Sequence, residues 1–319
     1  MNRWYSKPSP LLETRNSKSI IHTFKVKGHV GLTINPYQGC HHRCGYCYAT
    51  YEWSQEFYDK IYAKSNAAEV LETQLKSGKY RTHEPVMVSS ATDAYQPAEL
   101  KYCLTRRCVE VLQKYNVPYY VFTKSTIIER DLQLHKRYKR DCYLVWSITT
   151  CDEKTRRVIE PGTPPAYSMF KVIKKFVDEG VRCAINIDPI IPLITDGPQH
   201  LDEVVNACYD AGVKYVSGAI LRLRSDVWDR MKIILRILNI ENGIEIYKNT
   251  VYRFREPLKP WFNVSAYESY QIKVIQILKE KILQKGMMFS FPDLVKSRPL
   301  NLNKNPSAGG RQALLMNYM

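Results

Sequence analysis

Three cysteines lie close together in the first fifth of the chain, with the spacing CxxxCxxC. They are Cys40, Cys44 and Cys47, and an aromatic residue, Tyr46, comes directly before the last of them. Three thiolates can hold a [4Fe–4S] cluster and leave one iron without a protein ligand. Because such an iron can be chelated by a small molecule, the spacing predicts a cluster that binds a second cofactor at its open iron.

A structural zinc site is the alternative for the same residues, because Cys₃His zinc sites are common and His41 or His42 could supply the fourth ligand. Zinc ligands usually come as two separated pairs, whereas these thiols lie within eight residues and no second pair follows. The spacing therefore favours the cluster. The remaining cysteines are scattered singly, which argues against a disulfide framework and fits a reducing cytoplasm. They are Cys103, Cys108, Cys142, Cys151, Cys183 and Cys208.

The composition bounds the class of protein. At 319 residues with 45% hydrophobic content, the chain can bury the core of one barrel-sized domain with additions. No run reaches the ~18 apolar residues of a membrane span, and the polar N-terminus has no signal-peptide core, so we expect a soluble, cytoplasmic protein without a membrane partner. The net charge of +16 attracts polyanions, which keeps nucleic acid or an acidic substrate as a candidate partner. Solubility alone would explain the same charge.

Apolar, β-rich runs alternate with helical patterns along the chain, as in a parallel sheet built from βαβ units. Six such units predict an α/β fold, a partial (β/α)₆ barrel of the TIM type. We expect an N-terminal extension at 1–31, the barrel at 32–240 and a helical and irregular C-terminal extension at 241–319. The predicted strands are 32–38, 85–91, 118–123, 142–150, 182–188 and 214–221, with a strand-like piece at 20–27; the predicted helices are 66–77, 97–116, 126–138, 165–180, 199–211, 225–237 and 262–286.

Polar residues interrupt the apolar runs at one end of successive strands, the end where chemistry sits in folds of this kind. The cysteines follow the first strand directly. Any one polar cluster would be an ordinary turn or helix cap, but four at the same end predict a site. The clusters are 89–97 after the second strand, 123–125 after the third, 147–149 in the fourth and 186–188 at the end of the fifth.

Together these pieces resemble the spore photoproduct lyase-like branch of the radical S-adenosylmethionine (SAM) superfamily, also described as DNA-repair-photolyase-like. The resemblance spans roughly residues 33–195 and is weak past residue 225. It implies that SAM binds the open iron and is cleaved to a 5′-deoxyadenosyl radical, with the electron supplied by a flavodoxin or ferredoxin type of reductant. The matching pieces are Asn35–Ala49, Ser90–Glu99, Thr123–Ser125 with Arg130 and Asp131, Ser147–Thr149 with Glu160 and Pro161, and Asp188–Pro192.

The resemblance also implies roles for single positions. Cys40, Cys44 and Cys47 would bind the cluster, and the backbone of Tyr46 would lie against the SAM adenine. Lys124 suits the SAM carboxylate, although a solvated lysine at a barrel rim would look the same. The other predicted SAM-binding residues are Ser89, Ser90, Thr92 and Asp93 toward the methionyl amino group, which needs hydrogen-bond acceptors, Ser147 and Thr149 toward the ribose, and Asn186 and Asp188.

One departure from the family pattern is Ala91. Spore photoproduct lyases carry a hydrogen-donating cysteine at this place, so thymine-dimer reversal by that route is not expected here. Strand alternation puts Cys151 on the same face as Ser147 and Thr149. We therefore take Cys151 and Tyr95 as the candidate catalytic hydrogen donors.

The sequence predicts a radical SAM enzyme, of lyase or transferase type, that acts on a substrate it does not name. One candidate substrate is nucleic acid, in a repair or modification reaction that presents a base to the cavity. The alternative is a biosynthetic reaction on a small molecule or peptide, including transfer of another SAM-derived fragment. A non-catalytic, metal-stabilised nucleic-acid-binding protein is the less favoured third class.

Overall fold

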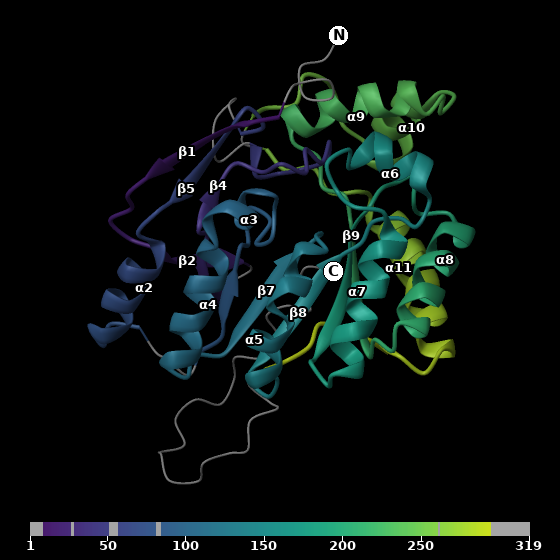
Figure 1. Cartoon of the computed structure of the whole chain (residues 1–319). Helices are drawn as coiled ribbons and strands as arrows, with labels where there is room; N and C mark the ends of the chain where they lie inside the picture. The colour runs from purple at the N-terminus through teal and green to yellow at the C-terminus, as the bar shows by residue number, and fades with distance from the viewer. Residues whose placement is uncertain (1–8, 27–28, 51–56, 81–83, 261, 295–319) are drawn as a thin grey trace.

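A single open sheet of eight strands forms the centre of the computed structural model, which describes residues 9–26, 29–50, 57–80, 84–260 and 262–294 (Figure 1). Its order is β11-β10-β9-β8-β7-β6-β3-β2, and every neighbouring pair is parallel except β2 with β3. The strands are β2 (Ile21–Val26), β3 (His29–Ile34), β6 (Val86–Val88), β7 (Tyr119–Thr123), β8 (Cys142–Ser147), β9 (Cys183–Ile190), β10 (Tyr215–Ile220) and β11 (Met288–Phe289).

The central strands are largely apolar, and most of their residues are buried because both faces of the sheet are covered. In β8 the sequence CYLVWS is buried up to Trp146, which is among the largest fully buried side chains. Its indole nitrogen donates to the carbonyl of Ser125, 3.2 Å away. Near-continuous burial of this kind is typical of parallel sheets with helices packed on them.

Helices follow the strands and lie along the outside of the sheet in Figure 1. Gly78, Gly180 and Gly212 follow three of them with φ of +71°, +73° and +74°, the left-handed conformation that ends helices and that glycine adopts without strain. The helices are α2 (Ala67–Lys76), α3 (Ala98–Tyr102), α4 (Leu104–Lys114), α5 (Leu132–Arg137), α6 (Glu153–Ile159), α7 (Ala166–Asp178), α8 (Pro198–Asp210), α9 (Ser225–Ile237), α10 (Gly243–Ile246) and α11 (Glu268–Gln284); η1 (Ile127–Asp131) is a 3₁₀ turn and η2 (Tyr247–Val251) a π turn.

The α/β class and the partial barrel are confirmed, with corrections to several element bounds. The predicted strand 32–38 is two pieces, because Pro36 has no N–H for the ladder. The predicted strand 142–150 ends at Ser147. The predicted helix 97–116 is broken at Cys103, which has a φ of +51°. Helix α6 was not predicted; its N-cap, Asp152, accepts a hydrogen bond from the backbone N–H of Thr155 at 2.8 Å.

Both predicted extensions contribute an edge strand to the main sheet, β2 on one side and β11 on the other. The division at residues 31 and 240 stays a prediction. An additional small sheet, which was not predicted, has the order β1-β5-β4. Its strands are β1 (Leu11–Arg15), β5 (Lys60–Lys64) and β4 (Tyr37–Gln38).

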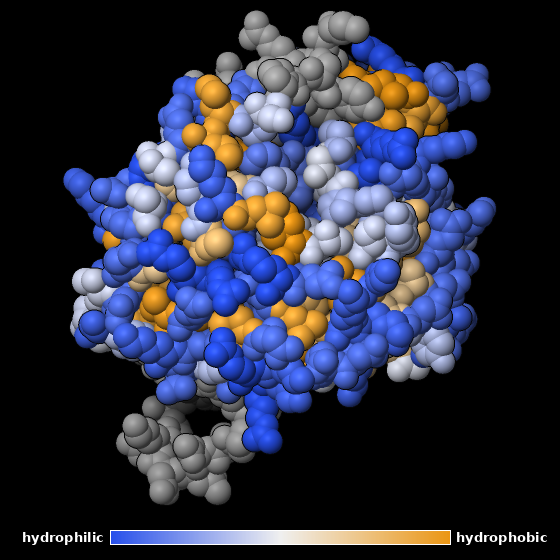
Figure 2. Space-filling model, viewed as in Figure 1, coloured by the Kyte–Doolittle hydropathy of each residue, from blue (hydrophilic) through white to orange (hydrophobic). Residues whose placement is uncertain are grey.

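The surface seen in Figure 2 is mainly hydrophilic, with separated apolar patches. Within the described residues, no helix is long and apolar enough to cross a membrane.

Candidate functional site

The three cysteines lie on one loop that starts directly after β4. Cys40 and Cys44 are buried and Cys47 is half-buried. Gly39 turns the chain into this loop with a φ of +85°. A Cβ at this position would lie only 2.2 Å from the carbonyl oxygen of Lys60, so no larger residue fits. Gly162 packs closely against the opposite side of the loop, because a Cβ on Gly162 would lie 2.3 Å from the carbonyl oxygen of His41. The loop is therefore held between β5 and the segment that follows α6.

Burial makes the free thiols hard to ionise. It raises the pKa of Cys40 to about 12, and the charge of Asp93 adds to this effect. The pKa values of Cys44 and Cys47 are also raised by burial, which the charge of Arg230 partly offsets at Cys47. Because a metal-binding thiol must lose its proton, these residues need a cationic partner such as iron, and their chemistry fits that partner.

The two histidines in the loop bind the protein itself. His42 forms an ion pair with Asp93, Nε2 to Oδ2 at 3.1 Å, and its Nδ1 lies 3.0 Å from the carbonyl oxygen of Gly162. Burial lowers the pKa of His42, but the charge and hydrogen bond of Asp93 outweigh it and the net pKa is raised. His41 Nδ1 lies 3.0 Å from Gln96 Oε1. Both nitrogens of His42 are therefore occupied, so a zinc ion could not use this ring without breaking these contacts.

Among the described residues, no three His, Cys, Asp or Glu side chains converge as the ligands of one metal ion do. The thiols of an iron–sulfur cluster each bind a different iron, so they need not converge on one point.

Asp93 joins the ends of β6 and β7 to the cysteine loop. Its Oδ1 accepts from the N–H of Tyr95 and the hydroxyl of Thr123, each at 2.8 Å, and its Oδ2 accepts from the N–H of Lys124 at 2.5 Å. With His42 on the same carboxylate, both oxygens are engaged by the protein. The position predicted to bind the SAM amino group is thus an internal anchor in this structure.

The hydroxyl of Ser89, at the end of β6, has no hydrogen-bond partner within the described residues although the side chain is only 2% exposed. Ser89 also has a φ of +62°, a conformation that costs a non-glycine residue about 1 kcal/mol or more. A buried orphan hydroxyl beside a predicted cofactor pocket fits a ligand that supplies the missing partner. The neighbouring hydroxyls are used: Ser90 lies 2.8 Å from Thr33 Oγ1, and Thr92 donates to the carbonyl of Tyr37 at 3.5 Å.

Lys124 lies in a buried polar group with Glu160, Tyr46 and Thr149. Its Nζ is 3.1 Å from Glu160 Oε1, 2.9 Å from the carbonyl oxygen of Ser147 and 3.4 Å from Thr149 Oγ1. The hydroxyl of Tyr46 donates to Glu160 and lies 3.2 Å from Thr149 Oγ1. Burial alone would lower the pKa of Lys124 and raise that of Glu160. The opposite charge of the partner outweighs burial in each case, so the pKa of Lys124 is raised, that of Glu160 is lowered, and both groups stay ionised.

The last predicted pair, Asn186 and Asp188, lies within β9. Asn186 Oδ1 accepts from Ser217 at 2.9 Å, and its Nδ2 is 3.4 Å from Asp188 Oδ2. Burial raises the pKa of Asp188 against the opposing charges of Arg222 and Lys124. The structure thus brings Asp188 into the electrostatic environment of Lys124.

Within the described residues, no hydrogen bond joins the side chain of either candidate hydrogen donor to the group around Lys124, and their role stays a prediction. Because β8 ends at Ser147, strand alternation does not extend to Cys151. Burial raises the pKa of this thiol to about 12, and the charge of Glu203, on α8, adds to the effect. The hydroxyl of Tyr95 binds Asp131 at 3.1 Å and His135 Nε2 at 2.9 Å, in a separate network.

Sequence reasoning did not select four residues that the structure places at the site. His42 was weighed only as a zinc ligand, and Glu160 was quoted in the family resemblance without a role. Gln96, whose amide donates to the carbonyl of Gly39 at 3.1 Å, lay inside a predicted polar cluster. Arg230, which binds the cysteine loop from α9, carried no sequence signal because its helix has an ordinary amphipathic pattern.

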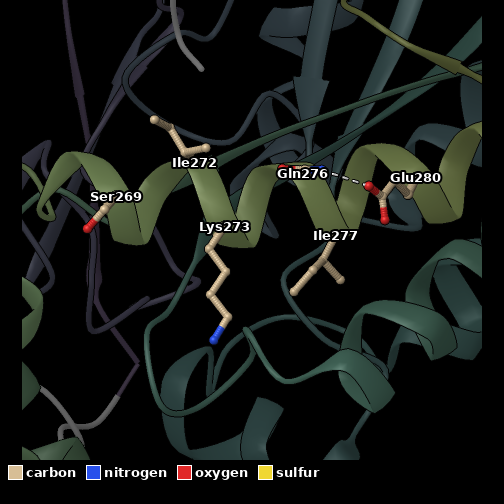
Figure 3. Close-up of a pocket in the computed structure, with 6 residues that line it drawn as sticks. All are labelled: Ser269, Ile272, Lys273, Gln276, Ile277 and Glu280. Carbon is tan, nitrogen blue, oxygen red and sulfur yellow. Dashed lines mark hydrogen bonds between the residues drawn. The ribbon is translucent and has the colours of Figure 1, made fainter.

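A shallow surface hollow lies along α11, away from these predicted residues (Figure 3). One of its contacts is internal, from Gln276 Nε2 to Glu280 Oε1 at 2.9 Å. Its lining residues are Ser269, Ile272, Lys273, Gln276, Ile277 and Glu280, which all belong to this helix.

Residues 34–205 match the model of the radical SAM superfamily, which is more than half of the chain. The chain therefore belongs to this superfamily of enzymes, whose members use SAM and an iron–sulfur cluster. It is 31% identical over 201 residues to an uncharacterized protein of Mycobacterium bovis, covering 60% of this chain and 59% of that protein. It is 24% identical over 269 residues to an uncharacterized protein of Methanocaldococcus jannaschii, and this match covers 83% of this chain and 92% of that protein. The chain thus spans about three fifths of the mycobacterial relative.

The fold is similar to that of spore photoproduct lyase. One solved structure of that enzyme, complexed with dinucleoside spore photoproduct, matches 86% of this chain and 79% of its own with a TM-score of 0.65 and 13% identity. A variant of it with bound AdoMet and the same dinucleoside matches with a TM-score of 0.64 and 13% identity, over 86% of this chain and 78% of its own. At this identity the similarity concerns the fold.

Proposed function

We propose that this chain is a radical SAM enzyme in which Cys40, Cys44 and Cys47 bind one [4Fe–4S] cluster. The observation that carries the proposal is the buried loop of three thiols beside the strand-end polar group, within a sequence that belongs to the superfamily. When both cofactors are bound, reductive cleavage of SAM supplies a 5′-deoxyadenosyl radical. The electron would come from a flavodoxin or ferredoxin type of reductant, and the proposed compartment is the cytoplasm.

In this proposal SAM is bound by side chains at the ends of β6, β7 and β8. Ser89 offers a buried hydroxyl that lacks a partner among the described residues. Lys124 stays positively charged beside Glu160, and the longest of its three contacts, 3.4 Å to Thr149, is the one we expect to be exchanged for the SAM carboxylate. Asp93 and His42 act by holding the cysteine loop to the strand ends.

The test is anaerobic reconstitution with iron, sulfide, SAM and dithionite, followed by mass analysis of every SAM-derived product. The proposal expects 5′-deoxyadenosine from the parent and none from a Cys44→Ala variant. One bound zinc, with no iron or sulfide, would reject it. A product from another carbon–sulfur bond of SAM would favour transfer of a different fragment.

For the substrate we propose nucleic acid, in repair or modification. Arg222 is exposed and lies next to Leu223, which is buried and forms an antiparallel bridge with Val264. Three residues after Val264, the ring of Tyr267 is exposed, and the guanidinium of Arg253 lies 3.6 Å from its centroid. Guanidinium groups beside exposed aromatic rings are typical of surfaces that bind single-stranded nucleic acid.

This substrate proposal excludes thymine-dimer reversal through a thiol at the end of β6, because Ala91 carries a methyl group there. Oligonucleotide binding should persist at ~150 mM salt and should prefer a lesion or unpaired base over plain duplex. Arg253→Gln should weaken it more than Lys285→Gln, a matched loss of charge over the ring of Tyr209. If neither binding nor SAM cleavage responds to any oligonucleotide, the biosynthetic alternative on a small molecule or peptide takes its place.

A further inference from the structure

Arg230 binds the cysteine loop from outside the region that the family model matches. It lies on α9, past residue 205. Its Nε donates to the carbonyl of Gly45 at 2.7 Å, and its Nη2 donates to the carbonyl of Cys47 at 2.9 Å and to the hydroxyl of Thr50 at 3.0 Å. The side chain is only 11% exposed. A guanidinium has the fixed fork of donors that can hold two backbone carbonyls at once, which a lysine cannot reproduce.

Two neighbours fix this guanidinium in place. Asp226, one turn earlier on α9, binds its Nη1 at 3.1 Å and also accepts from the hydroxyl of Thr50 at 2.5 Å. The ring of Tyr58 lies 6.0 Å from the guanidinium carbon, and its hydroxyl donates to the carbonyl of Cys44 at 2.6 Å. Side-chain donors therefore bind the carbonyls of Cys44, Gly45 and Cys47, and the donor to the last two is a largely buried cation.

We propose that Arg230 is a positioning residue for the iron–sulfur cluster, which holds Cys44 and Cys47 in their binding conformation and favours the reduced cluster through its charge. The inference rests on the proposed function. Reduction adds one negative charge to a cluster, and a cation in a largely buried site acts on that charge with little screening. The C-terminal part of the chain would thereby control how readily the cluster accepts an electron.

The test is an anaerobic redox titration of the reconstituted cluster in four variants. Arg230→Gln should make reduction about tenfold less favourable, which is ~59 mV more negative for one electron. Arg230→Lys, which keeps the charge, should stay near the parent value. Asp226→Asn, which removes an anion, should shift the potential in the opposite direction and by less. Lys232→Gln, a loss of charge on the same helix that pairs with Asp229 and Glu256, should leave it unchanged.

The expected shifts in reduction potential have opposite signs in Arg230→Gln and Asp226→Asn. A merely structural role would loosen the loop in both variants and shift both potentials in the same direction. A shift of the same sign in both, or an equal shift in Lys232→Gln, would overturn the electrostatic part of the proposal.

A second measurement, hydrogen exchange of the apoprotein, needs no cluster. The amides of Gly45 and Cys47 donate to the carbonyls of Ile159 and Cys44, at 2.8 and 3.1 Å. They should exchange faster in Arg230→Gln than in the parent and in Lys232→Gln, and equal rates would overturn the positioning part. If the parent takes up no iron, the proposed function fails, whereas this exchange result still decides whether Arg230 holds the loop.

Discussion

Buried charges gather in two regions of this molecule, and they are partnered differently. One is the strand-end site around Lys124, Asp93 and the cysteine loop. The other lies between α3, η1 and α5, where Glu99 accepts from Arg130 at 3.0 Å and from the N–H of Thr105 at 2.9 Å, while Asp131 binds Arg106 at 2.6 Å. We call this second group, with Tyr95 and His135, the helix-side network.

The difference lies in what each region leaves unmatched. In the helix-side network both ring nitrogens of His135 are occupied, by the hydroxyls of Tyr95 and Tyr119 at 2.9 and 3.0 Å. The strand-end site instead holds the thiols of Cys40 and Cys44, which are buried, the half-buried thiol of Cys47, and the hydroxyl of Ser89, which has no partner among the described residues. A buried network whose polar groups are all hydrogen-bonded within the protein stabilises the fold, whereas buried polar groups without partners point to a ligand.

The largest effect should come from the cysteine loop. Cys40→Ala, Cys44→Ala or Cys47→Ala should each abolish stable cluster loading, because in the proposed cluster every thiolate binds its own iron. Iron and sulfide per chain, measured after anaerobic reconstitution, give the result. Cys103→Ala, at a half-buried cysteine outside the loop, should load normally, and a loss there equal to that in the loop would contradict the assignment.

The helix-side network should affect stability and leave the cofactors alone. Glu99→Ala leaves Arg130 without one of its buried carboxylate partners, and breaking such a buried pair costs about 3–5 kcal/mol of unfolding free energy. Denaturant unfolding measures the loss, with Glu110→Ala, an exposed pair with Arg106, expected to cost ~0.5 kcal/mol. If Glu99→Ala lowers cluster loading or SAM affinity in the protein that remains folded, the two regions are not separate in function.

Stability should also depend on pH through His135. Burial lowers its pKa to about 4, below the ordinary value of 6.5. The unfolded chain therefore binds a proton first as the pH falls, so this contribution is complete above pH 6.5 and is lost between about 6.5 and 4. The loss should be roughly 3 kcal/mol. Unfolding free energies of the parent and of His135→Gln across this range give the test, and identical slopes would count against it.

The smallest effect should come from Ser89, compared with Ser125. Both side chains are 2% exposed, but Ser125 accepts from the N–H of Ile127 at 3.1 Å. Ser89→Ala should weaken SAM binding about fivefold, or ~1 kcal/mol, with little change in stability. Ser125→Ala should lower the stability and leave SAM binding nearly unchanged. Calorimetric SAM titration and unfolding of both variants decide the matter, and equal SAM affinity in parent and Ser89→Ala would remove Ser89 from the pocket.

Much of the fold followed from local patterns, because alternating β-rich and helical runs at βαβ spacing have few other solutions. The unpredicted elements depend on tertiary contacts. The strand β4 is two residues long and exists by pairing with β5, and helix α3 ends at Cys103 in a conformation that the helical pattern does not reveal.

The candidate site was predictable where the chemistry is local, as in the spacing of the cysteines. It was not predictable where a side chain's partners are distant in the sequence. Asp93 reads as a free acceptor after a strand, but His42 and the N–H of Lys124 bind its Oδ2, and Thr123 binds its Oδ1. Tyr95 is a chemically suitable hydrogen donor, yet Asp131 and His135, far along the chain, bind its hydroxyl. Arg230 reaches its carbonyl partners across more than 180 residues.

The most direct test of the central claim is the electron paramagnetic resonance spectrum of the dithionite-reduced protein, recorded with and without SAM. A [4Fe–4S] cluster with one open iron should give a signal that changes when SAM binds, and Lys124→Gln should need more SAM for the same change. A reduced protein with no iron–sulfur signal, or a signal that saturating SAM leaves unaltered, would contradict the assignment of Cys40, Cys44 and Cys47 to a SAM-binding cluster.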